Sequence, residues 1–180
     1  MARRITVVSA REMPYRRDQV VAEIREVQNI EITEVKADRV EVHPVTPDTG
    51  TYSVRGHFAA VPWRGEFAYE LTDAGFHSRT AGVPPEAAKV EGGFVVTPLA
   101  GGCTVIHYEH YVLAPWLRPL ALLVRLYLHR SMRRELRDIE ALAAATVSGQ
   151  AAPRDVPTAS SPAPDDIGEC SSLPPSLASS

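Results

Sequence analysis

The residues best suited to acid–base chemistry lie in the run His107-Tyr108-Glu109-His110. Successive side chains of a β-strand point to opposite faces, so His107 and Glu109 share one face while Tyr108 and His110 share the other. A shared face suits a His–carboxylate pair that orients an imidazole. If the face of His110 is the inner one, His110 is the best general acid or base in the chain. The alternative is a hydrogen-bonded strand histidine with no catalytic role.

Metal and nucleotide chemistry find no support in the residue spacing. Because His107 and His110 point to opposite faces of a strand, they cannot bind one ion together. The sequence contains no Gly-x-Gly-x-x-Gly, Walker or Gly-x-Ser-x-Gly motif. Cys103 opens a predicted strand and is expected to be a small buried residue. We therefore expect no metal and no cofactor.

A set of aromatic residues shares one face of the predicted strands. Tyr52, Trp63, Phe67 and Tyr69 alternate with polar or charged residues. Such a set lines an apolar ligand pocket or packs as an ordinary core, in which each large side chain contributes about 1.5–3 kcal/mol on burial. Tyr69 is the second catalytic candidate beside His110, because a buried phenol needs a hydrogen-bond partner. The ligand-lining residues that we expect are Tyr52, Phe58, Trp63, Phe67, Tyr69, Phe94, Tyr108, Val124, Tyr127 and Leu128.

The elements that position these residues follow from hydrophobic periodicity. Residues 5–8 form a short β-branched run, and residues 15–28 carry apolar positions at helical spacing. From residue 30 to residue 113 the period is two, with turn residues at short intervals, which is typical of antiparallel strands. Residues 116–145 return to helical periodicity over about eight turns. The order strand, helix, about six strands and one long helix predicts an α+β fold. In it, the helix closes the concave face of a curved sheet.

In this order of elements the chain resembles the SRPBCC superfamily, which has the START or helix-grip fold. The resemblance covers about residues 4–146 and rests also on Gly50-Thr51-Tyr52, on Val61-Pro62-Trp63-Arg64-Gly65 and on the Leu- and Arg-rich last helix. Within it, the chain looks like the polyketide cyclase/dehydrase and lipid-transport group. The resemblance implies a hydrophobic ligand inside the curve of the sheet. The family usually has two short helices after the first strand, whereas this sequence indicates one.

Composition bounds the domain and its surroundings. In the 180 residues, the last 34 hold 6 Pro, 8 Ser and 5 Ala, too little apolar surface to fold. We therefore predict a domain over residues 1–146 and a disordered tail over 147–180. A net charge of −3 and a pI near 6.1 give no case for nucleic-acid binding. The start of the chain lacks a signal peptide, so we expect a cytoplasmic protein.

Two surfaces have an ordinary interpretation and a functional one. Charged residues on the outward parity of the strands are expected to form a solvated face: Arg55, His57, Arg64, Glu66 and Glu70. Residues 113–128 are too short and too charged to span a bilayer. The arginines of the last helix could contact acidic lipids while Trp116 and Leu117 enter the membrane interface. Otherwise the helix packs on the sheet and the arginine stems cover its margins.

Three functions remain open from the sequence. The first is a module that binds a hydrophobic small molecule (lipid, polyketide-like or isoprenoid-like) between sheet and helix. The second is a cyclase or dehydratase in which His110 or Tyr69 moves a proton. The third is a protein-interaction or membrane-docking factor whose interior is filled by its own side chains.

Overall fold

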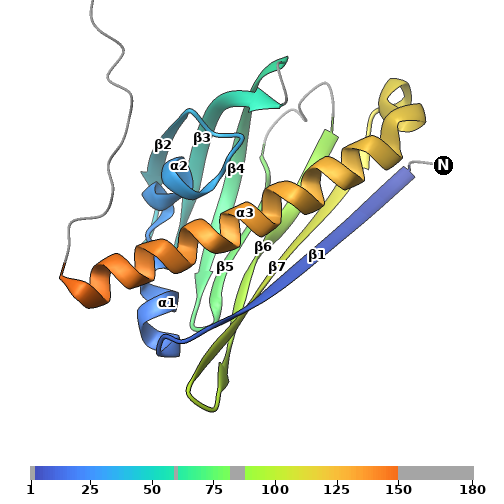
Figure 1. Cartoon of the computed structure of the whole chain (residues 1–180). Coiled ribbons are helices and arrows are strands. Elements are labelled where there is room, and N and C mark those ends of the chain that lie inside the picture. The colour runs from blue at the N-terminus through green and yellow to red at the C-terminus, as the bar shows by residue number, and fades with distance from the viewer. Residues whose placement is uncertain (1–2, 59–60, 82–87, 150–180) are drawn as a thin grey trace, which may run out of the picture.

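In a computed structural model, the chain folds into one curved antiparallel sheet with a long helix packed on its concave side (Figure 1). The structure describes residues 3–58, 61–81 and 88–149. Seven strands follow one another in the order β1-β7-β6-β5-β4-β3-β2, and all neighbours are antiparallel. Their bounds are β1 Arg3–Met13, β2 Arg39–Pro44, β3 Thr49–Phe58, β4 Val61–Thr72, β5 Gly75–Thr80, β6 Ala88–Leu99 and β7 Gly102–Leu113. The predicted α+β helix-grip architecture is confirmed.

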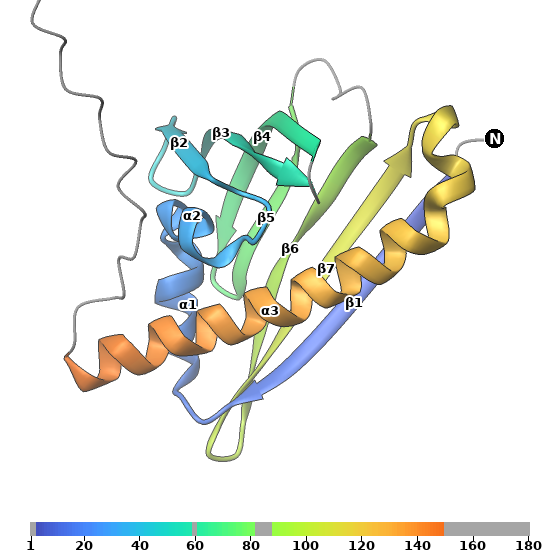
Figure 2. The same ribbon diagram turned by 45° about the horizontal axis from the view of Figure 1, so that its top comes forward.

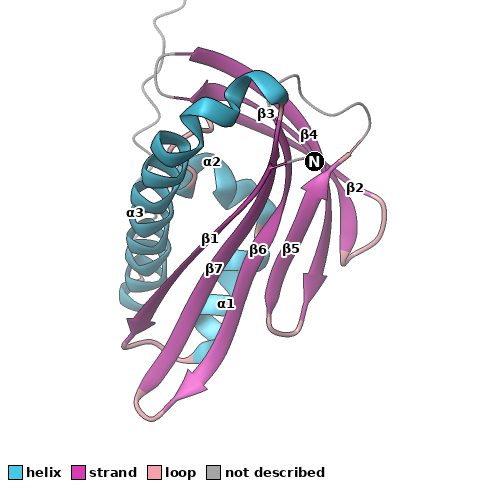
Figure 3. Cartoon of the chain, turned by 90° about the vertical axis from the view of Figure 1, so that its right-hand side faces the viewer, coloured by secondary structure: helices cyan, strands magenta, loops and turns pink. Residues whose placement is uncertain are grey.

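The long helix α3, Ala121–Ser148, crosses the concave side of the sheet (Figures 1 and 3). It buries Leu128, Met132 and Leu136 almost completely. The helix was expected from residue 116, but a 3-10 segment, η2 at Pro115–Leu120, comes first. Pro119 lies in that segment, and its missing N–H cannot continue an α-helical hydrogen-bond ladder. The helix ends at Gly149, whose φ of +67° is the left-handed conformation of a helix C-terminus.

Three short helical segments follow β1, where the sequence indicated one helix. They are α1 at Arg17–Arg25, a 3-10 turn η1 at Val27–Asn29, and α2 at Ile30–Thr33. The expected strand pairing from residue 30 is therefore wrong. The Thr33 hydroxyl donates to the Asn29 carbonyl across one helical turn, at 3.1 Å, and this local bond competes with strand pairing. A second short helix is thus present, and it lies with α1 against the C-terminal half of α3 (Figure 2).

The strands alternate between an inner face toward α3 and an outer face toward solvent. On β7 the inner positions 103, 105, 107, 109, 111 and 113 are buried, including Cys103 as expected. The predicted solvated face is confirmed, since Arg55, His57, Arg64, Glu66 and Glu70 are all exposed. Of the predicted tail, Val147 and Ser148 complete α3, and residues 150–180 lie outside the described residues. In the part of the chain that is described, no helix is long and apolar enough to cross a membrane.

Candidate functional site

A group of polar side chains lies beneath α3 in a largely apolar interior. Its members come from the loop after α2, from the inner face of β7 and from α3. Lys36 is 4% exposed, His107 4%, Glu109 7% and Glu135 2%. We call this group the Lys36 cluster; it comprises Lys36, His107, Glu109, Tyr111, Ser131 and Glu135, with Glu34 at its rim.

Two apolar clusters enclose the Lys36 cluster from either side. Along β7, Cys103 and Val105 belong to one apolar cluster, and Tyr111 and Leu113 border the other. Along α3, Leu128 and Met132 belong to the second cluster, whereas Leu136 and Ile139 belong to the first. Both elements therefore place His107, Glu109, Ser131 and Glu135 where the two clusters meet.

The backbone of Lys36 is fixed by β3 and β4. Its carbonyl accepts a hydrogen bond from the Trp63 indole Nε1 at 2.9 Å and another from the His57 amide at 3.1 Å. Gly56 makes this approach possible, because a Cβ at that position would lie 1.8 Å from the Lys36 carbonyl oxygen. The half-buried Trp63 thus positions the loop from which the lysine side chain enters the interior.

The Lys36 ammonium faces three carboxyl groups. Its Nζ lies 2.6 Å from Glu34 Oε1, 3.7 Å from Glu109 Oε1 and 3.8 Å from Glu135 Oε1. The Tyr111 hydroxyl donates to Glu109 Oε2 at 2.9 Å, and the Ser131 hydroxyl donates to Glu135 Oε1 at 2.8 Å. Each buried carboxyl group therefore has a neutral donor as well as the shared cation.

His107 lies between the two buried carboxyl groups. Its Nε2 is 3.9 Å from Glu109 Oε1 and its Nδ1 is 3.2 Å from Glu135 Oε2, and the ring stacks on Phe94 at 4.1 Å between centroids. The prediction that His107 and Glu109 share a face is confirmed. Glu135 is close, but the buried Nδ1 makes no hydrogen bond to it or to any other described residue. The Glu135 carboxyl is thus a close neighbour of this nitrogen without forming a hydrogen bond to it.

Burial and mutual charge separate the protonation states of the cluster. Burial raises the pKa of Glu135 to about 8 against the opposing effect of Lys36, and burial lowers the pKa of His107 to about 4. Burial alone would lower the pKa of Lys36, but Glu109 and Glu34 outweigh it and hold that pKa well above its usual value. At Glu109, burial raises the pKa, but Lys36, His107 and the Tyr111 hydrogen bond together outweigh burial and lower it.

Near neutral pH the cluster therefore combines an ammonium–carboxylate pair with an un-ionised carboxylic acid and a neutral imidazole. The ammonium stabilises negative charge on an oxygen, the acid donates a proton and the imidazole accepts one. Titratable groups whose pKa values are pushed apart in this way are typical of acid–base sites.

His110 and Tyr108 face away from this cluster, which corrects the expectation that they line the interior. The His110 Nδ1 is 2.9 Å from the Thr6 hydroxyl, and the Tyr108 hydroxyl is 3.0 Å from Nδ1 of His77. Both contacts lie on the outer face of the sheet, because positions 108 and 110 of β7 alternate with the buried inner positions. His110 is therefore the structural strand histidine that was the alternative, and not an interior acid or base.

The predicted aromatic set does face inward. Tyr52 stacks on Phe67 at 5.2 Å and lies 6.2 Å from Tyr69 between ring centroids, and Trp63 meets Phe67 edge-on at 6.3 Å. Tyr69 is buried in this aromatic packing, and no hydrogen bond or ion pair among the described residues joins it to the Lys36 cluster. Val124 and Leu128 are buried on the side of α3 that faces the sheet, and Phe94 and Tyr127 are partly buried. The side chain of Phe58 lies outside the described residues.

Lys36, Tyr111 and Glu135 were missed from the sequence, although two signals were present. The buried positions of α3 recur as 124, 128, 131, 135, 139 and 142, so Glu135 is a charged residue on an apolar stripe. The chain has 17 arginines but two lysines, Lys36 and Lys89. No spacing rule connects Lys36 to β7, because only the tertiary fold brings them together.

Two hollows lined by described residues lie away from the Lys36 cluster. One, of about 450 Å³, is a shallow surface depression over α1, lined by residues such as Arg17, Val21 and Arg25. A smaller one, of about 170 Å³, lies between the start of β1 and the start of α3. Neither touches the Lys36 cluster. The described residues contain no group of three His, Cys, Asp or Glu arranged to hold a metal ion.

Comparisons with solved structures establish the fold. The chain is similar to the Zhui aromatase/cyclase from a Streptomyces species, with a TM-score of 0.70 and 12% identity over 83% of this chain and 100% of that one. It is equally similar to TTHA0849 from Thermus thermophilus, with a TM-score of 0.70 and 16% identity over 79% and 99%. A STAR-related lipid transfer protein from Xanthomonas axonopodis matches at 0.59 and 13% identity over 77% and 85%. No family model and no curated protein matches the sequence.

Proposed function

We propose that the protein binds a hydrophobic small molecule between the sheet and α3. The proposal starts from the helix-grip fold, which the chain shares with the structures it resembles. The apolar body of the ligand packs on the aromatic set, and an oxygen-bearing polar group of the ligand meets the Lys36 cluster. The observation that carries this proposal is the buried ammonium of Lys36, 4% exposed, together with the Nδ1 of His107, which makes no hydrogen bond to any described residue.

A purely structural role accounts poorly for these residues. Replacing a buried ion pair by apolar side chains of similar size is often neutral or stabilising, by about 1–4 kcal/mol. Apolar side chains flank the cluster on both β7 and α3, so an apolar core would fit the same elements. Buried polar atoms without a hydrogen bond are rare in native proteins and need a reason. A ligand oxygen that completes the set supplies one.

The structural neighbours favour the same class of ligand. One is titled a lipid transfer protein and another an aromatase/cyclase. Lipids and polyketide chains share an extended apolar body with one or more oxygen atoms. We therefore include both in the proposed ligand class and leave the individual ligand to experiment.

Paired fluorescent probes test the proposal. We expect anilinonaphthalene sulfonate to bind about tenfold more tightly than uncharged N-phenylnaphthylamine, because ~1.4 kcal/mol from one buried charge corresponds to a factor of ten. Lys36→Met should abolish this difference, while Lys89→Met, at the exposed second lysine, should preserve it. The measurement is a fluorescence titration of each protein. If neither probe binds to the wild-type protein, the proposed hydrophobic ligand site is rejected.

A second candidate function is enzymatic, of the cyclase or dehydratase type. The observation in its favour is the un-ionised Glu135 carboxyl beside the neutral His107 imidazole, with 3.2 Å between Oε2 and Nδ1. In a proton-transfer step His107 would accept a proton from carbon next to a carbonyl group. Glu135 would give its proton to the carbonyl oxygen, and the product is an enol.

Deuterium exchange into methyl heptyl ketone tests this second candidate. We expect the protein to accelerate exchange, and general acid–base catalysis typically contributes about 10²–10⁴-fold. His107→Gln should lose the acceleration, and His110→Gln on the outer face should keep it. Proton NMR in D₂O follows the loss of signal. If the two variants exchange at equal rates, the enzymatic candidate is rejected and binding remains as the proposed function.

A further inference from the structure

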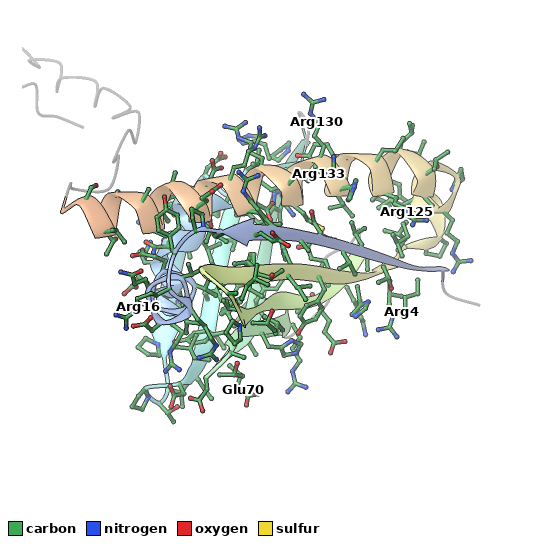
Figure 4. All side chains as sticks on the ribbon, turned by 60° about the horizontal axis from the view of Figure 1, so that its bottom comes forward. Arg4, Arg16, Glu70, Arg125, Arg130 and Arg133 are labelled. Carbon is green, nitrogen blue, oxygen red and sulfur yellow. The ribbon has the colours of Figure 1, made fainter. Side chains whose placement is uncertain are left out.

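One face of α3 and the adjoining η2 is apolar at its tip and cationic along its length. The large apolar side chains are well exposed: Trp116 63%, Leu120 46%, Leu122 68%, Leu123 64% and Leu126 59%. Arginines follow on the same helix, and Arg4 extends from the neighbouring strand β1 at this end of the molecule (Figure 4). We call this the Arg/Leu surface; it comprises these five apolar residues with Arg4, Arg125, Arg130 and Arg133.

Helical spacing places the leucines and arginines on one outward line. Leu122, Leu126, Arg130 and Arg133 are separated by four, four and three residues, so they share a face of α3. Arg4 and Arg125 both border the small hollow between β1 and α3, which Leu122 also lines. The cations therefore flank the apolar tip along the helix and across the adjacent strand.

Within residues 3–58, 61–81 and 88–149, no carboxylate pairs with these arginines. From residue 114 to residue 134 the sequence has five arginines and no Asp or Glu. Within the described part of the chain, no ion pair involves Arg4, Arg125, Arg130 or Arg133. An exposed apolar patch with unneutralised cations at its margin is typical of a surface that binds an anionic, partly apolar partner.

We propose that the Arg/Leu surface docks the protein on a membrane rich in anionic phospholipid. The tip residues enter the headgroup boundary, and the arginines bind lipid phosphates. A second copy of the chain fits this surface poorly, because a two-fold contact pairs the same patch with itself and residues 114–134 offer no carboxylate to the arginines of the other copy. The surface lies outside the Lys36 cluster, so the proposal is independent of the ligand.

Vesicle co-sedimentation tests the docking proposal. We expect the full chain to bind vesicles of phosphatidylcholine with phosphatidylglycerol at least tenfold more tightly than vesicles of phosphatidylcholine alone. Added salt should weaken the binding. Arg130→Glu combined with Arg133→Glu should remove this preference. The matched control, Arg55→Glu with Arg64→Glu, makes the same change of net charge at an exposed cross-strand pair on the sheet and should bind as the wild type does.

The apolar part of the surface has its own variant. Leu122→Ser with Leu126→Ser keeps every arginine and should also weaken binding to the anionic vesicles. Three results would overturn the proposal: no preference for anionic vesicles, equal losses in the two arginine pairs, or a dimer in analytical ultracentrifugation that the Leu122→Ser/Leu126→Ser variant dissolves. The last result would assign the surface to a second copy of the chain.

Discussion

Lys36→Met should lower the free energy of unfolding by about 3–5 kcal/mol, because removal of one partner leaves a buried carboxylate without its cation. Glu109 loses the ammonium 3.7 Å away and retains the Tyr111 hydroxyl as its donor. Urea denaturation at neutral pH measures the loss. Lys89→Met should change stability by less than about 0.5 kcal/mol, as is usual for an exposed substitution.

A double variant separates lost charge from lost packing. Lys36→Met with Glu109→Gln removes both members of the ion pair and should recover part of the stability lost in Lys36→Met. A single-variant loss below about 1 kcal/mol would mean that Lys36 is not held as a buried cation.

The stability of the protein should fall by about 1 kcal/mol between pH 6.5 and pH 8, owing to Glu135. Its pKa is about 8 in the folded chain against a reference value of 4.5. The folded state therefore binds the additional proton between these values, and stability falls as pH rises. His107, with a pKa of about 4 against 6.5, has the opposite slope between those two values. Between pH 4.5 and pH 6.5 the effects of Glu135 and His107 on stability largely cancel. Above pH 6.5 the fall in stability caused by Glu135 predominates.

Glu135→Gln isolates this effect. The amide is neutral at every pH and can still accept from the Ser131 hydroxyl, so the decline between pH 6.5 and pH 8 should disappear. Urea denaturation in a series of buffers measures both proteins. An unchanged decline in Glu135→Gln would assign the titration to another group.

Periodicity predicted the sheet and the long helix because each buries one continuous face. The residues of β4 alternate over twelve positions, and the apolar stripe of α3 recurs over its whole length. Short segments carried too little pattern. Ile30 and Ile32 alternate with polar neighbours as a strand would, yet α2 forms there and is stabilised by local hydrogen bonds. Alternation over four residues does not distinguish the two structures.

The site depended on contacts that no local pattern contains. Alternation placed His107 with Glu109 on one face, but the face toward α3 could not be chosen without the neighbours of β7. Lys36 reaches that face only because Trp63 and Gly56 fix its loop from two other strands. Glu135 was predictable in principle as a charge on an apolar stripe. Its lysine partner, about a hundred residues earlier in the chain, was not.

NMR of the wild-type protein labelled at the lysine Cε tests the central claim most directly. The chain has two lysines, so the spectrum contains two side-chain signals, which Lys89→Met assigns. The exposed leucines of α3 could also bind a fluorescent probe, whereas the Lys36 signal reports only on the interior. Titration with anilinonaphthalene sulfonate should shift the Lys36 resonance and leave that of Lys89 in place. If the probe saturates the protein and the Lys36 resonance does not move, the result contradicts a ligand bound at this lysine.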